Sequence, residues 1–272
     1  MPETAALLQM LALLLGVGAC AGLVAGLLGV GGGNVLVPAF FYALGYLGYA
    51  GGQVMQVCVA TSLATIVFTS VRSVQAHHAK GAVDVAMLRS IAPMVVIGAL
   101  IGTLIASQMS SRALQGVFGV LAGLAGLYMA FGRANWRLGD DLPQQPLPGG
   151  IAGALGLVSA LMGIGGGTFG VPLMTLYGSP IHRAVGTASG LGVIIAVPAI
   201  LGFLALPVAD APPYTIGAVN LPAFAAVILT TYITTPWGAA LAHRMNPAPL
   251  KRAFAAFLIL VALNMLRKAL GL

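Results

Sequence analysis

Long apolar runs dominate this chain, and polar positions gather in the short segments between them. No charged residue occurs between Glu3 and Arg72, and 40 uncharged residues separate Asp141 from His182. A helix needs about 20 apolar residues to cross a bilayer, so these stretches hold about three and about two membrane segments. Segments such as 95–105 are apolar on every side, which excludes the alternating strands of an outer-membrane barrel.

The apolar runs predict ten helices and therefore an all-α polytopic membrane protein. The first half gives 5–30, 34–48, 54–76, 86–107 and 113–131. The second half gives 150–165, 168–179, 184–206, 218–241 and 250–270. Each half thus has four full spans and one shorter segment, 34–48 or 168–179, that either crosses or is re-entrant.

Composition strengthens this interpretation. The chain has 272 residues with 12 Lys+Arg and 5 Asp+Glu, so 6% are charged and 59% hydrophobic, with a mean hydropathy of +1.02. Soluble domains are about 25% charged, which excludes a soluble enzyme or binding module. The net charge of +7 is attributed to loop residues that orient membrane helices, not to nucleic-acid binding. Cys20 and Cys58 have no spacing typical of a disulfide or a metal site.

A sequence motif occurs twice. Gly29–Pro38 (GVGGGNVLVP) returns as Gly163–Pro172 (GIGGGTFGVP), at an offset of 134. Three further matches follow in the same order: 59–62 with 185–188, 81–84 with 217–220, and 102–118 with 238–254. The matches predict a first transmembrane repeat (1–132), a cytoplasmic linker (133–148) and a second transmembrane repeat (149–272).

The positive-inside rule distinguishes eight spans from ten. With eight spans, Lys and Arg divide seven to five between the two sides, which orients nothing. With ten, nine lie on one side: Arg72, Lys80, Arg89, Arg133, Arg137, Arg183, Arg244, Lys251 and Arg252. The other side then holds Arg112, Arg267 and Lys268. We therefore favour ten segments with both termini outside, and two inverted repeats of five segments, as in many secondary transporters.

The repeated motif carries the candidate chemistry. Consecutive glycines cost a helix about 1 kcal/mol each relative to Ala. Asn34 or Thr168 follows the glycines and can cap a helix, and a proline four residues later fits the first turn. The prediction is a broken helix whose free amides bind an anion, at Gly31, Gly32, Gly33 and Asn34 in one copy and Gly165, Gly166, Gly167 and Thr168 in the other.

The alternative for such glycines is close helix packing, which is the role expected of the pairs Gly22/Gly26 and Gly98/Gly102. On that view Gly98→Ala is a harmless control for substitutions such as Gly32→Val. A second candidate lining comprises Thr61, Ser62, Thr187 and Ser189, although such hydroxyls often bond to their own helix. His182 and Arg183 precede the second copy and either attract an anion or only orient the helix. His77 and His78 are expected to form a solvated loop pair.

The whole pattern resembles the sulfite exporter TauE/SafE family. The residues that carry this resemblance are the two glycine motifs with Pro38 and Pro172, followed by Ala60-Thr61-Ser62 and by His182–Thr187. The resemblance implies a permease of the bacterial inner (plasma) membrane for sulfite or organosulfonates. The first repeat departs from the pattern, because Gln56-Val57 stands where the second has His182-Arg183.

The sequence therefore predicts a secondary transporter, with export as the expected direction, that binds a sulfur-containing anion between the repeats. A passive anion channel and a non-transporting scaffold are the alternatives. No catalytic motif, cofactor or metal site is expected. The partners are a small inorganic or organosulfur anion and the bilayer, with no nucleic acid and with homo-oligomerisation left open. Since no carboxylate falls mid-span, voltage-driven efflux is expected, and proton coupling through His182 or His77/His78 is the alternative.

Overall fold

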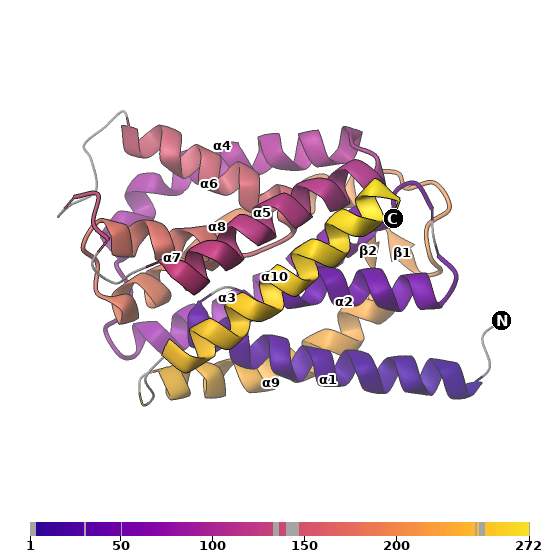
Figure 1. The fold of residues 1–272 in the computed structure, drawn as a ribbon, viewed down its shortest axis with the longest axis horizontal. Helices are drawn as coiled ribbons and strands as arrows, with labels where there is room; N and C mark the ends of the chain where they lie inside the picture. The colour runs from indigo at the N-terminus through magenta and orange to yellow at the C-terminus, as the bar shows by residue number, and fades with distance from the viewer. Residues whose placement is uncertain are drawn as a thin grey trace.

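The computed structural model describes residues 4–29, 31–49, 51–132, 136–139, 147–242, 244 and 248–271. These residues form ten helices and one small hairpin (Figure 1). The first five helices are α1 (Thr4–Leu28), α2 (Gly33–Tyr46), α3 (Val54–His78), α4 (Val85–Gln108) and α5 (Ser111–Phe131). The other five are α6 (Leu147–Met162), α7 (Gly167–Leu176), α8 (Ile181–Leu204), α9 (Leu221–Ala242) and α10 (Ala248–Leu270). Strands β1 (Thr215–Ile216) and β2 (Val219–Asn220) pair between α8 and α9. The predicted all-α polytopic fold is confirmed.

Helix length separates two kinds of segment. Seven of the described helices are long and apolar enough to cross a membrane, namely α1, α3, α4, α5, α8, α9 and α10. The helices α2, α6 and α7 have 14, 16 and 10 residues. At about 1.5 Å per residue they fall short of a bilayer core of about 30 Å. The sequence predicted a full span over 150–165, but α6 ends at Met162 because Gly163 adopts a left-handed conformation (φ 66°).

The packing places α3 and α8 at the centre. These two helices contact each other, α9 packs on α3, and α4 packs on α8. Around them α1 packs on α9, α6 on α4, and α5 on α10, while the short helices α2 and α7 lie against α3 and α8. Every one of these contacts has a counterpart when helix numbers are shifted by five. The two halves therefore interleave, and neither forms a separate body.

The loops gather at two ends of the bundle. At the first, which we call the hairpin end, Ser111 N donates to Gly52 O (2.8 Å) and Ala209 N donates to Gln53 Oε1 (2.9 Å). The β1–β2 hairpin lies at this end, on the right of Figure 1. At the second, the linker end, Leu138 N donates to Leu176 O (2.8 Å) and Arg183 pairs with Asp84.

The described basic residues are unevenly divided between these ends. The helix directions put Arg72, Lys80, Arg89, Arg137, Arg183, Arg244, Lys251 and Arg252 toward the linker end. Only Arg112, Arg267 and Lys268 lie toward the hairpin end, while Arg133 lies outside the described residues. By the positive-inside rule, we propose that the linker end faces the cytoplasm.

This assignment predicts opposite accessibility for the two ends. In a background with Cys20→Ala and Cys58→Ala, Gly52→Cys should react with an impermeant thiol reagent added outside intact cells. Leu138→Cys should react only after the membrane is opened. Both positions suit the test, because a β-carbon at Gly52 meets no atom within 4 Å and Leu138 is 69% exposed. Labelling of both from the same side would overturn the topology.

Small residues allow the outer helices to pack backbone against backbone, as expected for Gly22/Gly26 and Gly98/Gly102. A β-carbon at Gly26 would lie 2.6 Å from Ala239 N of α9. One at Gly98 would lie 2.7 Å from the carbonyl carbon of Gly153 in α6. The expectation that Gly98→Ala is a harmless control is therefore wrong, because the added methyl group would push α4 away from α6.

Candidate functional site

Both glycine motifs break the helix in the interior of the bundle. Between α1 and α2, Gly29, Gly31 and Gly32 have φ values of 65°, 73° and 80°. Between α6 and α7, Gly163 has a φ of 66°. These are left-handed conformations that glycine adopts without a steric penalty. The glycines are thus required by the backbone itself.

The two breaks touch each other. A β-carbon at Gly31 would lie 3.1 Å from the Cα of Gly165, and one at Gly33 would lie 2.7 Å from the Cα of Ile164. Asn34 Nδ2 donates a hydrogen bond to Thr168 Oγ1 (2.8 Å), and both side chains are buried. Residues 134 positions apart in the sequence thus meet at one point, where the backbones leave no space between them.

From this point the two short helices run in opposite directions. The helix α2 ends at the hairpin end, where Lys268 Nζ lies 4.6 Å from the ring of Tyr42. The helix α7 ends at the linker end, where Leu176 O accepts from Leu138 N. Their N-termini therefore converge. The first amides of a helix lack intrahelical acceptors, and the N-terminal end of its dipole is positive, so the junction favours an anion.

The local chemistry at the helix starts differs from the prediction. The residues at the N-cap positions are Gly32 and Gly166, without side-chain caps, so Asn34 and Thr168 are not the caps. The helices begin at Gly33 and Gly167, and the side chains of Asn34 and Thr168 bond to each other instead. Pro38 and Pro172 consequently fall in the second helical turn and not in the first.

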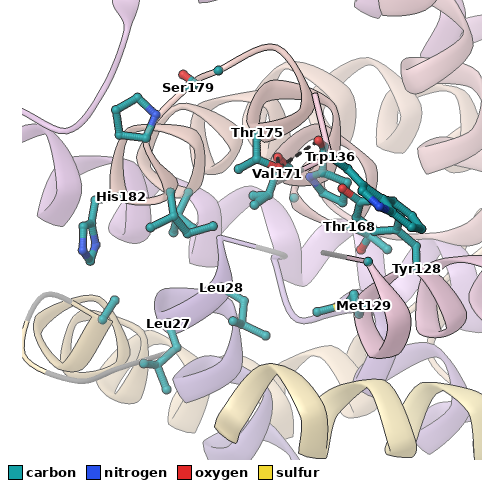
Figure 2. A pocket seen from close by; sticks show the side chains of 18 of the residues that line it. Leu27, Leu28, Tyr128, Met129, Trp136, Thr168, Val171, Thr175, Ser179 and His182 are labelled. Atoms are coloured by element: carbon teal, nitrogen blue, oxygen red, sulfur yellow. Dashed lines mark hydrogen bonds between the residues drawn. The ribbon is translucent and has the colours of Figure 1, made fainter. Parts of the chain in front are cut away.

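A cavity of about 700 Å³ leads from the linker end to the start of α7. Figure 2 shows Thr168, Val171 and Thr175 of α7 on one side and Leu27 and Leu28 of α1 on the other. The ends of α5 and α9, the starts of α8 and α10, and residues 136–137 complete the wall. Gly167 and Thr168 belong to the lining, so this cavity reaches one of the two converging N-termini.

Basic and aromatic side chains line the same cavity. Arg137, His182 and Arg252 contribute basic side chains, and none of the described residues that line this cavity is acidic. Trp136 and Tyr128 lie with ring centroids 6.4 Å apart (Figure 2). A basic mouth raises the local concentration of anions. The cavity is therefore suited to collecting an anion at the linker end.

The structure brings only part of the predicted set together. Gly167, Thr168 and His182 line the cavity, whereas Gly31, Gly32, Gly33, Asn34, Gly165 and Gly166 form the packed junction beyond it. Sequence reasoning missed Tyr128, Trp136, Arg137 and Arg252. The basic linker was the available signal for Arg137, but Trp136 was interpreted as an interfacial anchor.

The hydroxyls of the second candidate set hold helices together. Thr61 Oγ1 accepts from Asn220 N (3.0 Å), and Thr187 Oγ1 accepts from Asp84 N (2.9 Å). Each half therefore receives a hydrogen bond from the loop of the other. Ser62 Oγ donates to Gly163 O (2.7 Å), beside the junction, and Ser189 Oγ bonds Ser73 Oγ (2.8 Å).

The Arg183 side chain forms an ion pair with Asp84 and does not point into the cavity. Its Nη2 donates to Asp84 Oδ2 (2.7 Å), while Asp84 Oδ1 accepts from Met87 N and caps α4. The Arg183 side chain is 56% exposed, so the pair contributes at most about 1 kcal/mol. Arg183 is a link between the halves at the linker end and does not line the cavity.

The two adjacent histidines differ in environment. The helix α3 extends to His78, beyond the predicted end at 76, and this turns His77 into the bundle. His77 is 1% exposed, whereas His78 is exposed. The predicted solvated pair is therefore wrong for His77. Among the described residues, no three His, Cys, Asp or Glu side chains gather in a way that could hold a metal ion.

The chain is similar in sequence to a known family and to several membrane proteins. The family described as sulfite exporter TauE/SafE matches residues 14–265. A "probable membrane transporter protein" of Haemophilus influenzae is 33% identical over 258 residues, covering 93% of this chain and 96% of the relative. A protein of the same description from Methanocaldococcus jannaschii is 24% identical over 95% of this chain and 96% of the relative. No solved structure matches.

The apolar helices and the relatives agree on location and general role. The chain is an integral protein of the plasma membrane, and its relatives are named as membrane transporters. The match extends over both glycine motifs and over almost every helix described above. The chain belongs to the sulfite exporter TauE/SafE family of membrane transporters.

Proposed function

We propose that the protein is a secondary transporter of sulfur-containing anions, such as sulfite or organosulfonates, and that it works as an exporter. The anion enters the cavity from the linker end and is held at the N-terminus of α7. Gly167 and Thr168 are the first contacts there, and the junction with Gly31–Asn34 is the point past which it must move. The observation that carries this proposal is the convergence of two helix N-termini at the end of a basic cavity.

The charge of the ligand follows from the site. Backbone amides and the Thr168 hydroxyl are donors, and Arg137 and Arg252 bring positive charge along the approach. Sulfite and sulfonates present several acceptor oxygens, which suits such a set of donors. The family name motivates sulfur as the central atom.

We further propose that the two halves are inverted repeats of 1–132 and 149–272, joined by the linker 133–148. The interleaved packing supports this division, since α1 on α9 corresponds to α6 on α4. So do the reciprocal hydrogen bonds of Thr61 with Asn220 and of Thr187 with Asp84. The junction would then lie on the pseudo-twofold axis, where transporters of this design bind their substrates.

A carrier fits better than an open channel. The cavity stops at the junction, and Gly31 and Gly165 lie in backbone contact beyond it. An anion reaching Thr168 therefore requires a rearrangement of the halves before it can leave at the hairpin end. Saturable flux with counterflow is expected of a carrier, and flux proportional to concentration is expected of a channel.

The direct test is flux of radiolabelled sulfite and of sulfoacetate in proteoliposomes that contain the purified protein. We expect protein-dependent flux of at least one of the two anions, with counterflow when the other side is loaded. Absence of flux across a wide panel of anions would remove transport of this class from consideration.

Thr168→Val tests the end of the cavity. Valine keeps the shape but removes a hydroxyl that donates to the anion, a charged hydrogen bond worth about 1.5–3 kcal/mol. We expect the apparent affinity for the anion to fall about tenfold or more. Thr103→Val is the matched control, because this buried hydroxyl of α4 bonds only within its own helix, to Ala99 O (2.9 Å). Equal affinities in the two variants would exclude Thr168 from the site.

A further inference from the structure

The cavity at the linker end has a counterpart in the first half, and that counterpart is closed. The repeat offsets of 134, 126 and 136 pair three apolar residues that line the cavity with three residues toward the hairpin end. The pairs are Val171 with Val37, Val185 with Val59, and Ala242 with Ala106. The three lining residues retain some exposure, whereas all three counterparts are 0% exposed. The same positions therefore line a cavity in one half and are completely buried in the other.

Gln56 holds this region closed from the α3 side. At the offset of 126 it corresponds to His182, which lines the cavity. Gln56 is 0% exposed, and its Nε2 donates to the carbonyl oxygens of Ala106 (3.3 Å) and Met109 at the end of α4. In the second half, the start of α8 and the end of α9 are separate parts of the cavity wall. The Gln56 amide thus joins two helix ends across the place where the matching cavity would open.

Two buried amide oxygens mark the same region. Gln56 Oε1 has no hydrogen-bond partner among the described residues. Asn34 Oδ1, at the junction, likewise finds no donor in the described part of the chain, and Asn34 corresponds to Thr168 at the end of the cavity. A buried acceptor without a donor is destabilising. Close packing is therefore a costly arrangement for exactly those positions whose counterparts line an open cavity.

A lysine and two aromatic rings cover the region on the side of the hairpin end. Lys268 Nζ lies 5.1 Å from the centroid of the Phe41 ring and 4.6 Å from that of Tyr42. These cation–π contacts join the end of α10 to α2. The offsets pair Lys268 with Gly132 and Phe41 with Thr175, and both Gly132 and Thr175 line the cavity. Lys268 therefore places a positive charge at the rim of the closed counterpart.

We infer that the hairpin end contains a second anion-binding site, closed in this structure, with Lys268 as its cationic residue and the Gln56 amide as a hydrogen-bond donor. The inference rests on the proposed anion transport and on the proposed inverted repeats. When the halves rearrange, Gln56 Nε2 leaves the carbonyl oxygens of α4 and Lys268 leaves the two rings. Both groups then donate to the sulfur-containing anion that the linker-end cavity binds in the present arrangement.

The first test measures the half-saturation concentration of sulfoacetate at each face separately. Exchange is followed in right-side-out and in inside-out membrane vesicles, and the face at which Gly52→Cys reacts with an impermeant thiol reagent identifies the hairpin end. Lys268→Gln should raise the half-saturation concentration about tenfold at the hairpin end and change it less than about twofold at the linker end. Lys268→Arg keeps the charge and should stay close to the unmodified protein at both faces.

Arg112→Gln is the matched control, because Arg112 is exposed at the same end and the substitution removes the same charge. It should leave the half-saturation concentration unchanged at both faces. An equal rise in Arg112→Gln and Lys268→Gln would reduce Lys268 to a part of the general surface charge. A rise at both faces in Lys268→Gln would show that the lysine does not belong to a site of the hairpin end. Either result would overturn the inference.

The second test does not depend on Lys268. In a background with Cys20→Ala and Cys58→Ala, Val37→Cys should react with an impermeant thiol reagent applied at the hairpin end during sulfoacetate exchange. The reason is that its counterpart Val171 lines the open cavity. A Val37→Cys protein that exchanges sulfoacetate and never reacts would contradict the opening of this site and leave anion transport standing.

Native Cys58 is the control for this labelling and is kept in a background with Cys20→Ala alone. Cys58 is 0% exposed, as Val37 is, but its counterpart Ala184 is also 0% exposed and lies outside the cavity lining. Cys58 should therefore stay unreactive, and labelling equal to that of Val37→Cys would mean general loosening instead of a defined site. Absence of protein-dependent flux of both sulfite and sulfoacetate would instead remove the proposed function.

Discussion

Asn34→Asp is expected to stop anion transport while the protein stays folded in the membrane. Aspartate has the shape of asparagine, and its carboxylate would accept a hydrogen bond from the Thr168 hydroxyl in place of the present one. A fixed negative charge would also be stabilised by the two helix N-termini. The variant therefore fills the proposed anion site with an anion of its own.

The size of the effect follows from repulsion. Two negative charges about 4 Å apart repel by about 4 kcal/mol at an effective dielectric constant of about 20. We expect flux of sulfite or sulfoacetate to fall more than about a hundredfold, with thermal stability in detergent unchanged or raised. Gln53→Glu is the control, since it makes the same change of charge at the hairpin end and keeps the acceptor for Ala209 N. Normal flux in Asn34→Asp would move the anion site away from the junction.

Gly33→Ala should also abolish transport, but through the backbone. The new methyl group would overlap the carbonyl oxygen of Gly163 and lie 2.7 Å from the Cα of Ile164. Neither backbone can yield without separating α2 from the start of α7. Overpacking of this kind costs about 1–3 kcal/mol, and here the strain falls on the proposed anion site.

We expect Gly33→Ala to lower the unfolding midpoint measurably and to reduce flux to background. Gly45→Ala belongs to the same helix and adds the same methyl group where no atom lies within 4 Å. It should match the unmodified protein in both measurements. If Gly33→Ala transported normally, the contact of the two motifs would have no part in the transport cycle.

Helix positions could be predicted because the bilayer imposes them. Each apolar run has one way to satisfy its backbone in hydrocarbon, which is a helix, and glycines and loop polar residues end it. The break at Gly31–Gly33 was visible as a cluster of residues that disfavour helix. Periodicity alone could not show that α6 ends inside the bundle, because the left-handed turn at Gly163 depends on a single residue.

The candidate site was harder to predict because its parts come from distant segments. The sequence identified both motifs but assigned Asn34 and Thr168 to capping their own helices, whereas each finds its partner in the other. The cavity depends on how α5, α8 and α10 end around α7, and one sequence carries no information on such contacts. His77 is buried because α3 continues two residues beyond its predicted end at residue 76. An error of two residues is usual when helix ends are predicted from a sequence.

The opposed courses of α2 and α7 have a consequence for the direction of travel. An anion that comes from either face of the membrane has to pass along one short helix, α7 from the linker end or α2 from the hairpin end, before it reaches the positive N-terminus at the junction. On the proposed mechanism the attraction at the junction is the same for entry and for exit, because it belongs to both N-termini at once. Such a site works reversibly. Net export would then reflect the higher concentration of the anion in the cell, and the same chain would take the anion up whenever that concentration ratio was inverted.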